Sequence, residues 1–412
     1  MKLFKASLIA LGLASAGFAN AASLAITNAK VHTQTAQGVL DNATIIIEDG
    51  KISAINPTSI SADSTLDAQG KVLTPGFINS LNTLGLVEVS AVKRSQDAHD
   101  DDATITFDPS TAFNPKSSLI PLMRKGGITS NVTMPHGGKD MFKGLLFAAD
   151  TSGQFDSLVE TRLGVLVELG AESKGSRAMS LQKLTEKLTD ANKALAKAKK
   201  DQAKDKKEPK RDELILQRLV KGEQKLIAYV DRATDILALL KLKQQFNLDL
   251  ILASADDAIL VTEQIVAAKV PVIVNADANL PEGFDSLHTS LSNPGKLAKA
   301  GVQVVLMTSG DTHMGYELRH QAGIAVAHGM DYQSALAAVT KNPAQVFGLS
   351  ELGTIAVGQQ ADLVLWSADP FELSTKVEQL WIQGQAHSTE SRIDKLRDRY
   401  MAESELPRAY IK

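Results

Sequence analysis

The sequence predicts an α/β protein, a (β/α)8 TIM-like barrel joined to a small β-sandwich domain built from both termini. Three observations support this prediction. The middle of the chain alternates short apolar runs with longer amphipathic stretches, the pattern of a parallel α/β architecture. Both ends are instead rich in β-branched runs and turn residues. A chain of 412 residues is also long enough for one large and one small domain.

Residues 1–21 have the features of a secretory signal peptide. Lys2 and Lys5 precede an uncharged stretch, Ala6 to Phe18, and Ala19-Asn20-Ala21 places small residues at the cleavage site. The apolar stretch is too short to span a bilayer comfortably, so we expect a cleaved signal and no membrane anchor. We therefore predict a periplasmic or secreted protein. The absence of cysteine excludes disulfides, thiolate metal sites and a lipid-anchored lipoprotein.

The predicted sandwich takes strands from both ends of the mature chain. Residues 22–70 supply Ser23 to His32, Ala43 to Glu48 and Lys51 to Ile55, with Asp49-Gly50 as a hairpin turn. Residues 347–388 supply Ala361 to Trp366 and Val377 to Gln383. We expect residues 389–412 to form a C-terminal helix or tail.

Residues 71–346 are predicted to form the barrel. Amphipathic helices are expected between several of its strands, for example at Ala233 to Gln245 and Asp256 to Ala268. Because a (β/α)8 barrel needs eight strands, we expect the one missing from the pattern to be short or irregular. The seven strand candidates are Val72–Asn82, Ile128–Met134, Gly164–Leu169, Lys225–Val230, Asp249–Ala253, Val270–Asn275 and Val302–Met307.

A charged segment at about 171–223 interrupts the barrel pattern. Leucines at helical spacing flank a lysine-rich stretch from Lys193 to Arg211, which predicts an inserted helical hairpin with Pro209 near its turn. The basic tip is open to two interpretations, contact with a nucleic acid or acidic surface and a solvated helix face. We favour the solvated face and predict no nucleic-acid partner, because the net charge of the chain is only -3.

An ordered series of motifs resembles the imidazolonepropionase-like branch of the amidohydrolase superfamily. The first motif is Thr74-Pro75-Gly76-Phe77-Ile78-Asn79, at the start of the predicted barrel. Ser309-Gly310-Asp311 follows the last predicted barrel strand, and Asn342-Pro343-Ala344 and Ala361-Asp362-Leu363-Val364 close the series. The resemblance implies one or two divalent metals at the C-terminal mouth of the barrel. A metal-bound hydroxide would attack a C–N bond, and the last aspartate, Asp311, would move the proton.

The usual metal ligands are replaced in this chain. Leu81 and Thr83 occupy the positions of the His-x-His pair, and Tyr229 and Ser254 align with the next two histidines. Leucine cannot ligate a metal, and neutral oxygen ligands do not offset the cost of dehydrating a divalent ion. The resemblance therefore implies a reduced site, with one zinc ion held by Asp311 or with no metal.

Five residues are the candidates for the site. Asp311 is the predicted general base or metal ligand, and its alternative role is to cap the helix that follows. His313 is the second catalytic candidate because it follows the last strand, where barrel loops form active sites. His136 follows the second strand, and we expect it to bind substrate together with Tyr229 and Arg232.

Two functions from different classes remain open. The first is an exported hydrolase that acts on C–N bonds of a small-molecule substrate, a non-peptide or a small cyclic or peptide-like amide. The second is a catalytically inactive periplasmic binding or scaffold protein that retains the barrel. The resemblance also makes a homo-oligomer possible. Fold alone does not choose between these functions.

Overall fold

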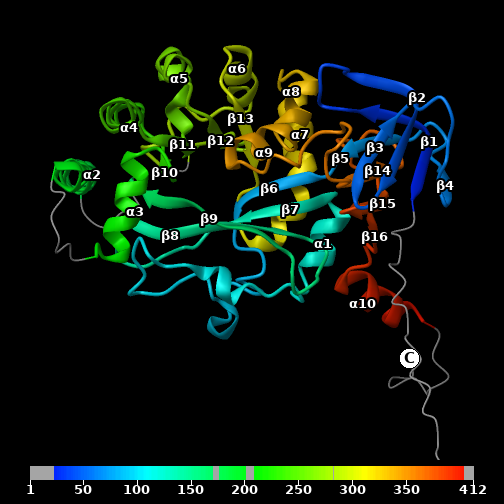
Figure 1. The fold of residues 1–412 in the computed structure, drawn as a ribbon, viewed down its shortest axis with the longest axis horizontal. Coiled ribbons are helices and arrows are strands. Elements are labelled where there is room, and N and C mark those ends of the chain that lie inside the picture. The colour runs from blue at the N-terminus through cyan, green and yellow to red at the C-terminus, as the bar shows by residue number, and fades with distance from the viewer. Residues whose placement is uncertain (1–22, 170–175, 201–207, 282, 403–412) are drawn as a thin grey trace, which may run out of the picture.

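The computed structural model describes residues 23–169, 176–200, 208–281 and 283–402, which form a large barrel beside a smaller β-domain (Figure 1). The predicted signal peptide lies outside the described residues. Two sheets of eight strands each organise the described chain. Within this part of the chain, no helix combines the length and the apolar character needed to cross a membrane.

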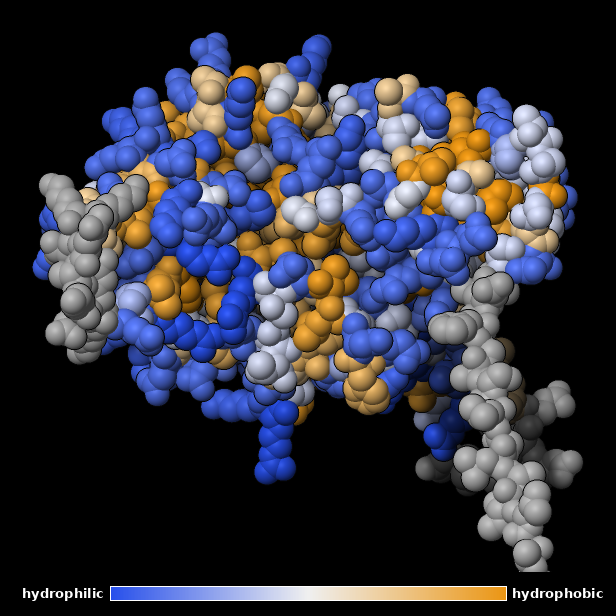
Figure 2. Space-filling model, viewed as in Figure 1, coloured by the Kyte–Doolittle hydropathy of each residue, from blue (hydrophilic) through white to orange (hydrophobic). Residues whose placement is uncertain are grey.

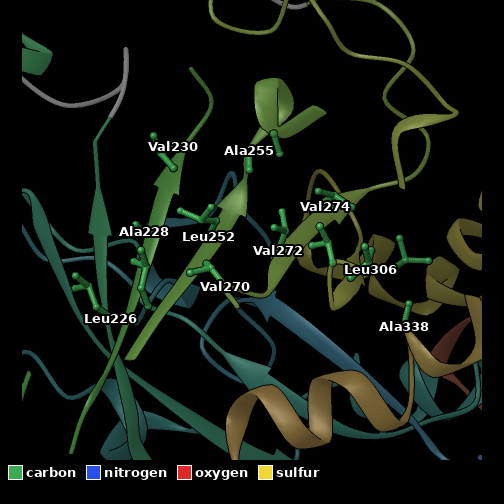
Figure 3. Packing of buried hydrophobic residues seen from close by; sticks show 14 of the residues in the cluster. Leu226, Ala228, Val230, Leu252, Ala255, Val270, Val272, Val274, Leu306 and Ala338 are labelled. Carbon is green, nitrogen blue, oxygen red and sulfur yellow. The ribbon is translucent and has the colours of Figure 1, made fainter. Parts of the chain in front are cut away.

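The barrel sheet has the strand order β13-β12-β11-β10-β9-β8-β7-β6, and β13 contacts β6, so the sheet nearly closes on itself. Apolar side chains alternate between its two faces. Leu226 and Leu252 belong to the cluster that packs against the helices (Figure 3). Their neighbours Ile227 and Ile251 face the other side of the sheet and belong to the separate cluster inside the barrel. The barrel strands are β6 Phe77–Asn82, β7 Ile128–Thr133, β8 Phe142–Asp150, β9 Leu158–Glu168, β10 Lys225–Val230, β11 Asp249–Ser254, β12 Val272–Asn275 and β13 Val304–Met307.

The eighth barrel strand is β8, which is not short but is irregular, because its pairing with β9 contains register shifts. It has nine residues, all of them buried, and it runs antiparallel to both β7 and β9. No helix separates β8 from its neighbours, so the helix–strand alternation that marks a parallel unit is missing there. A nearly uniform apolar run without that alternation gives no periodic signal.

The segment Val72 to Asn82, expected as one strand, is divided between the two sheets. β5 (Val72–Pro75) pairs with β1 and β14 in the β-domain, whereas β6 enters the barrel. Gly76 lies at the change of sheet, where a Cβ atom would come within 2.1 Å of the Thr129 side chain. The glycine therefore permits the close approach at which the chain passes from one sheet to the other.

The β-domain sheet confirms the prediction that both termini build one domain. Its order is β16-β15-β14-β5-β1-β2-β3, with β4 paired to β1. Ile26, Ile45, Leu363 and Trp381 from opposite ends of the chain share one buried cluster. The remaining strands are β1 Leu24–His32, β2 Val39–Glu48, β3 Lys51–Ile55, β4 Ser64–Asp67, β14 Leu363–Trp366, β15 Val377–Ile382 and β16 Gln385–His387.

Helices cover much of the outside of the barrel, and α9 packs against the cluster inside it. The inserted segment forms the expected two helices, α2 and α3, and its connection at residues 201–207 lies outside the described residues. Leu184 and Leu188 of α2 are fully buried, so the insertion packs as part of the helical layer. The helices are α1 Ile120–Lys125, α2 Arg177–Lys200, α3 Arg211–Val220, α4 Ala233–Phe246, α5 Thr262–Ala268, α6 Asn293–Lys299, α7 Leu318–Ala327, α8 Tyr332–Ala337, α9 Lys341–Phe347 and α10 Arg392–Met401.

Candidate active site at the barrel rim

A pocket of 290 Å³ lies where the loops after β6, β7 and β13 meet, and we call it the rim pocket. The parallel strands end at this edge, which is where barrels of this kind place their active sites. The structure therefore brings together Thr83, His136 and Asp311, which the sequence singled out separately. The pocket is lined by Thr83, Val87, Ser90, Gln96, Ala98, His99, His136, Gly310, Asp311 and Thr312.

Asp311 is exposed at the edge of the rim pocket and accepts a hydrogen bond from a neighbouring hydroxyl. The Ser90 Oγ donates to Asp311 Oδ1 at 2.5 Å. Asp311 occupies the N-cap position of the 3₁₀ helix η4 (Thr312–Glu317), but its side chain makes no capping hydrogen bond. The capping alternative is therefore wrong for this side chain, and the carboxylate faces the pocket.

A second cavity of 760 Å³, the outer groove, continues from the rim pocket between α1, η4 and α10. The two cavities share Val87, Ser90, Asp311 and Thr312. His313 lines the outer groove only, so the two catalytic candidates lie in connected but different spaces. Apolar side chains dominate the rest of the groove, including Leu119, Leu122, Met314, Tyr316 and Ile393.

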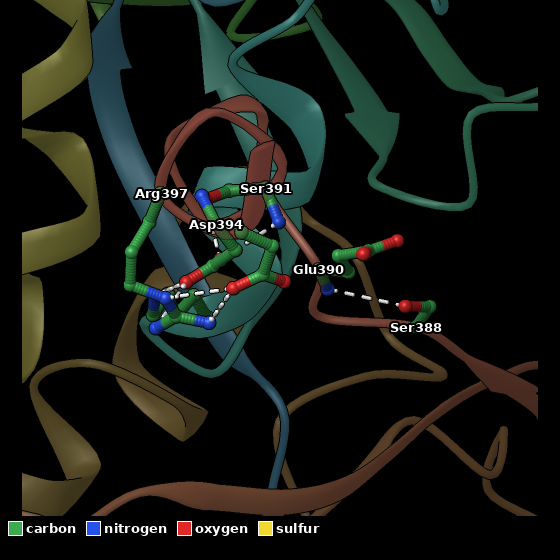
Figure 4. Close-up of polar contacts among 7 residues, drawn as sticks. Ser388, Glu390, Ser391, Asp394 and Arg397 are labelled. Carbon is green, nitrogen blue, oxygen red and sulfur yellow. Dashed lines mark hydrogen bonds and ion pairs between the residues drawn. The ribbon is translucent and has the colours of Figure 1, made fainter. Parts of the chain in front are cut away.

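The C-terminal helix α10 is fixed in place as one side of the outer groove. Ser391 and Asp394 form a capping box at its start, and Arg397 lies 3.5 Å from the Asp394 carboxylate (Figure 4). The Lys125 Nζ, at the end of α1, lies 2.7 Å from Asp394 Oδ1. The hydrogen bonds from Lys125 and Ser391 hold the pKa of Asp394 well below its usual range.

His136 lines the rim pocket from the loop after β7. Its backbone N–H donates to the Ala98 carbonyl at 2.7 Å, which ties this loop to the one after β6. Although part of the ring is exposed, desolvation by the surrounding loops lowers its pKa, against an opposing effect of Glu168. The imidazole is therefore neutral at pH 7 and can donate one hydrogen bond.

Tyr229 and Arg232, the other predicted substrate contacts, line neither the rim pocket nor the outer groove. The Tyr229 hydroxyl donates to Met307 Sδ at 3.6 Å, and burial raises its pKa. Arg232 Nε lies 2.5 Å from Asp285 Oδ1, at the start of α4. The structure thus gives Arg232 an ion-pair partner in the loop after β12.

The residues at the usual ligand positions do not fit a metal centre. Leu81 is buried among apolar neighbours inside the barrel, where Met134, Tyr229 and Met307 also pack. The Thr83 hydroxyl is engaged in a short hydrogen bond with that of Thr312. Across the described parts of the chain, no three His, Asp or Glu side chains group closely enough to hold a metal ion. No catalytic step can be built on metal ligands in this arrangement.

Sequence analysis missed three polar residues near the barrel mouth, Ser90, Lys143 and Asp231. Ser90 is separated from Asp311 by 221 positions in the chain, and nothing in its local sequence marks it as a partner. Lys143 Nζ lies 3.1 Å from Glu168 Oε2. Lys143 belongs to β8, the antiparallel strand that the sequence pattern did not predict. Asp231, directly after β10, accepts a hydrogen bond from Ser254, and burial raises its pKa. A carboxylate just after a parallel strand is a signal that could have identified Asp231.

The fold has two parts: a barrel with a cavity at the ends of its strands, and a second sheet made from both termini. An amidohydrolase from Thermotoga maritima MSB8 has this architecture, with a TM-score of 0.81 and 22% identity over 88% of this chain and 99% of that one. An adenosine deaminase from Xanthomonas campestris with bound zinc has a TM-score of 0.52 and 17% identity, covering 92% of this chain and 99% of its own. At these identities the likeness establishes the fold alone.

The sequence comparisons match the second half of the chain to one family and two short stretches to known enzymes. Residues 228–386 match the Amidohydrolase family. Amidohydrolase tasK of Hapsidospora irregularis is 42% identical over 60 residues, and a 5'-deoxyadenosine deaminase of Methanosarcina barkeri (strain Fusaro / DSM 804) is 44% identical over 61. Each match covers 14% of this chain but only 6% and 14% of those proteins. The family model thus matches less than half of the chain, and the fold of the whole described chain is similar to that of the solved amidohydrolase.

Proposed function

We propose that the chain hydrolyses C–N bonds of small molecules at the rim pocket, with Asp311 as the general base and without the metal centre of its superfamily. The observation that carries the proposal is the convergence of Asp311, Ser90 and His136 on one pocket at the strand ends. A carboxylate can take a proton from the attacking group and return it to the leaving nitrogen. A neutral His136 is placed to donate a hydrogen bond to the carbonyl oxygen as charge develops there.

The dimensions of the two cavities indicate the kind of substrate. The rim pocket has room for a small amide or ureide, and the outer groove can hold an apolar substituent next to it. Asp311 lies where the cavities join, so the bond to be cleaved would lie at this junction. These features favour a small cyclic or substituted amide.

Hydrolysis of a panel of cyclic amides, ureides and dipeptides tests this proposal, with release of the amine or ammonia as the readout. We expect turnover that persists after dialysis against a chelator and that is lost in Asp311→Asn. Turnover that disappears with the chelator and returns with zinc would contradict the metal-independent mechanism.

A binding protein without catalysis is the second candidate, and the filled barrel interior favours it. Leu81, Met134 and Met307 occupy the space near the usual ligand positions with apolar side chains. Under this alternative, members of the panel would raise the melting temperature of the protein without being consumed.

We also propose that the protein is exported after removal of residues 1–21. The basic start, apolar stretch and Ala19-Asn20-Ala21 support this proposal. N-terminal sequencing of the protein recovered from the periplasm or medium should begin at Ala22. Recovery of the chain with Met1 intact from the cytoplasm would contradict it.

A further inference from the structure

We propose that Ser90 is the nucleophile of the rim pocket and that Asp311 activates its hydroxyl. This inference rests on the hydrolase function proposed above. The Ser90 Oγ donates to Asp311 Oδ1 at 2.5 Å, the short distance of a hydroxyl bonded to an ionised carboxylate. Both residues line the rim pocket and the outer groove, so the pair lies at the junction of the two cavities.

The loop that carries Ser90 is held closed by its own hydrogen bonds. Val87 and Gln96 form an isolated β-bridge, and the Asp97 N–H donates to the Leu86 carbonyl at 2.8 Å. The Ser95 Oγ lies 2.9 Å from the Val89 carbonyl and 2.8 Å from the Val92 carbonyl. The Gln96 side-chain amide donates to the Ser90 carbonyl. These contacts fix the backbone on both sides of Ser90 while its side chain stays exposed.

A serine nucleophile would supply the attacking oxygen that a metal-bound hydroxide would otherwise provide. In the superfamily the attacking oxygen comes from a metal-bound hydroxide, but Leu81 and Thr83 stand at the first ligand pair. The Thr83 hydroxyl also lines the rim pocket, but its described partner is the hydroxyl of Thr312 and not a carboxylate. Ser90 is the rim-pocket hydroxyl whose described partner is a carboxylate.

The reaction balances with the groups present and water. The Ser90 Oγ forms a bond to the carbonyl carbon while its proton passes to Asp311. The C–N bond then breaks, and the nitrogen leaves with the proton from Asp311, which gives an acyl-serine and a free amine. A water molecule attacks the acyl-serine and gives its proton to Asp311. The carboxylic acid is released as the Ser90 Oγ recovers that proton.

Ser118 provides a matched control within the outer groove. Its Oγ donates to Glu88 Oε2 at 3.2 Å, so it too pairs with a carboxylate. The same Glu88 also accepts from the Ser118 N–H at 3.3 Å and from Asn114 at 3.4 Å, which divides the acceptor among longer contacts. Ser118 lines the outer groove and not the rim pocket. It therefore tests whether any groove serine reacts.

Labelling of the full chain with a fluorophosphonate probe, read by intact mass and peptide mapping, tests the inference without a known substrate. We expect one adduct, which maps to Ser90 and not to Ser118, and which is absent in Ser90→Ala and at least tenfold slower in Asp311→Asn. Circular dichroism of each variant checks that it is folded. No adduct on folded wild-type protein, or equal labelling of Ser90→Ala, would overturn the inference.

Turnover separates this inference from the proposed function. Loss of amide hydrolysis in both Ser90→Ala and Asp311→Asn supports the nucleophile. If Ser90→Ala keeps the wild-type rate within threefold while Asp311→Asn loses it, Ser90 is not the nucleophile and the base function of Asp311 stands. Labelling of Ser90 in a protein that hydrolyses no amide supports the activated serine and contradicts the proposed hydrolase function.

Discussion

The interior of the barrel and its rim differ sharply in chemistry, although they are built by the same strands and the loops that follow them. Leu81 and Met307 point into an apolar core near the strand ends. A few residues farther along the same segments, Thr83, Ser90 and Asp311 line a polar pocket. The comparison teaches that the side chains near the strand ends inside the barrel are apolar, whereas the polar side chains of the candidate site lie at the rim.

The replaced ligands are consistent with this division. A divalent ion inside the barrel needs several charged or imidazole ligands to offset its dehydration. An apolar side chain at position 81 instead gains stability from burial, and it fills the space that a ligand set would need. Ser90, His136 and Asp311 at the rim are exposed to solvent, so water can reach them for hydrolysis.

The largest effect is expected at the rim, from Asp311→Asn. Removal of the general base should lower kcat/KM for the best amide of the panel by about 10²–10³-fold. The melting temperature should change little, because the side chain is exposed. Asp101→Asn, an exposed aspartate that pairs with Lys139, is the control and should keep the wild-type rate. Equal rates for Asp311→Asn and Asp101→Asn would mean that the carboxylate at the rim pocket has no catalytic role beyond that of an ordinary surface aspartate.

Inside the barrel, Leu81→Ala should cost stability. Loss of this buried side chain should lower the free energy of unfolding by about 2–4 kcal/mol, measured by denaturant titration. Val357→Ala, at a side chain 64% exposed, should change it by less than about 0.5 kcal/mol. A Leu81→Ala variant as stable as wild type would mean that the interior is not the packed core described here.

Asp362 is a carboxylate buried between the barrel and the β-domain, and it therefore contrasts with the exposed carboxylate of Asp311 at the rim. Burial raises its pKa to about 6, although Gln383 N–H and Gln360 Nε2 donate to Oδ1. The folded state therefore holds this proton more tightly than the unfolded state, and stability from Asp362 falls as pH rises from about 4 through 6.

Asp362→Asn keeps an oxygen for both donors and removes this titration. Relative to wild type, we expect the variant to gain about 1–3 kcal/mol of stability between pH 4 and pH 7.5, measured by denaturant titration at each pH. A stability difference that is constant with pH would contradict the raised pKa.

The smallest effect is expected from Arg232→Ala. The partly exposed ion pair with Asp285 should contribute less than about 1 kcal/mol of stability. Because Arg232 lines neither cavity, KM should stay within threefold of wild type. A tenfold rise in KM would contradict this expectation and support the prediction from the sequence that Arg232 contacts substrate.

Periodicity and local motifs allowed much of the fold to be predicted. The β-branched ends and the seven apolar runs identified both sheets, because each signal is local. β8 carried no alternation, and the division at Gly76 depends on a contact with Thr129 that sequence spacing does not encode.

The candidate site was less predictable for the same reason. Asp311 and the replacements at Leu81 and Thr83 follow from motif positions. The pairing of Asp311 with Ser90, and of Arg232 with Asp285, depends on how distant loops pack. Sequence reasoning therefore singled out Asp311, which lines the rim pocket, but it gave no sign of the partner residues Ser90 and Asp285.

The metal content of the purified protein tests the central claim most directly. The chain is produced with added zinc, dialysed and analysed by elemental mass spectrometry, with Asp311→Ala beside it. Because the barrel interior is apolar and the proposed mechanism needs no metal, we expect well below one zinc per folded chain in both the wild type and Asp311→Ala. Stoichiometric zinc in wild type that is lost in Asp311→Ala would contradict the account.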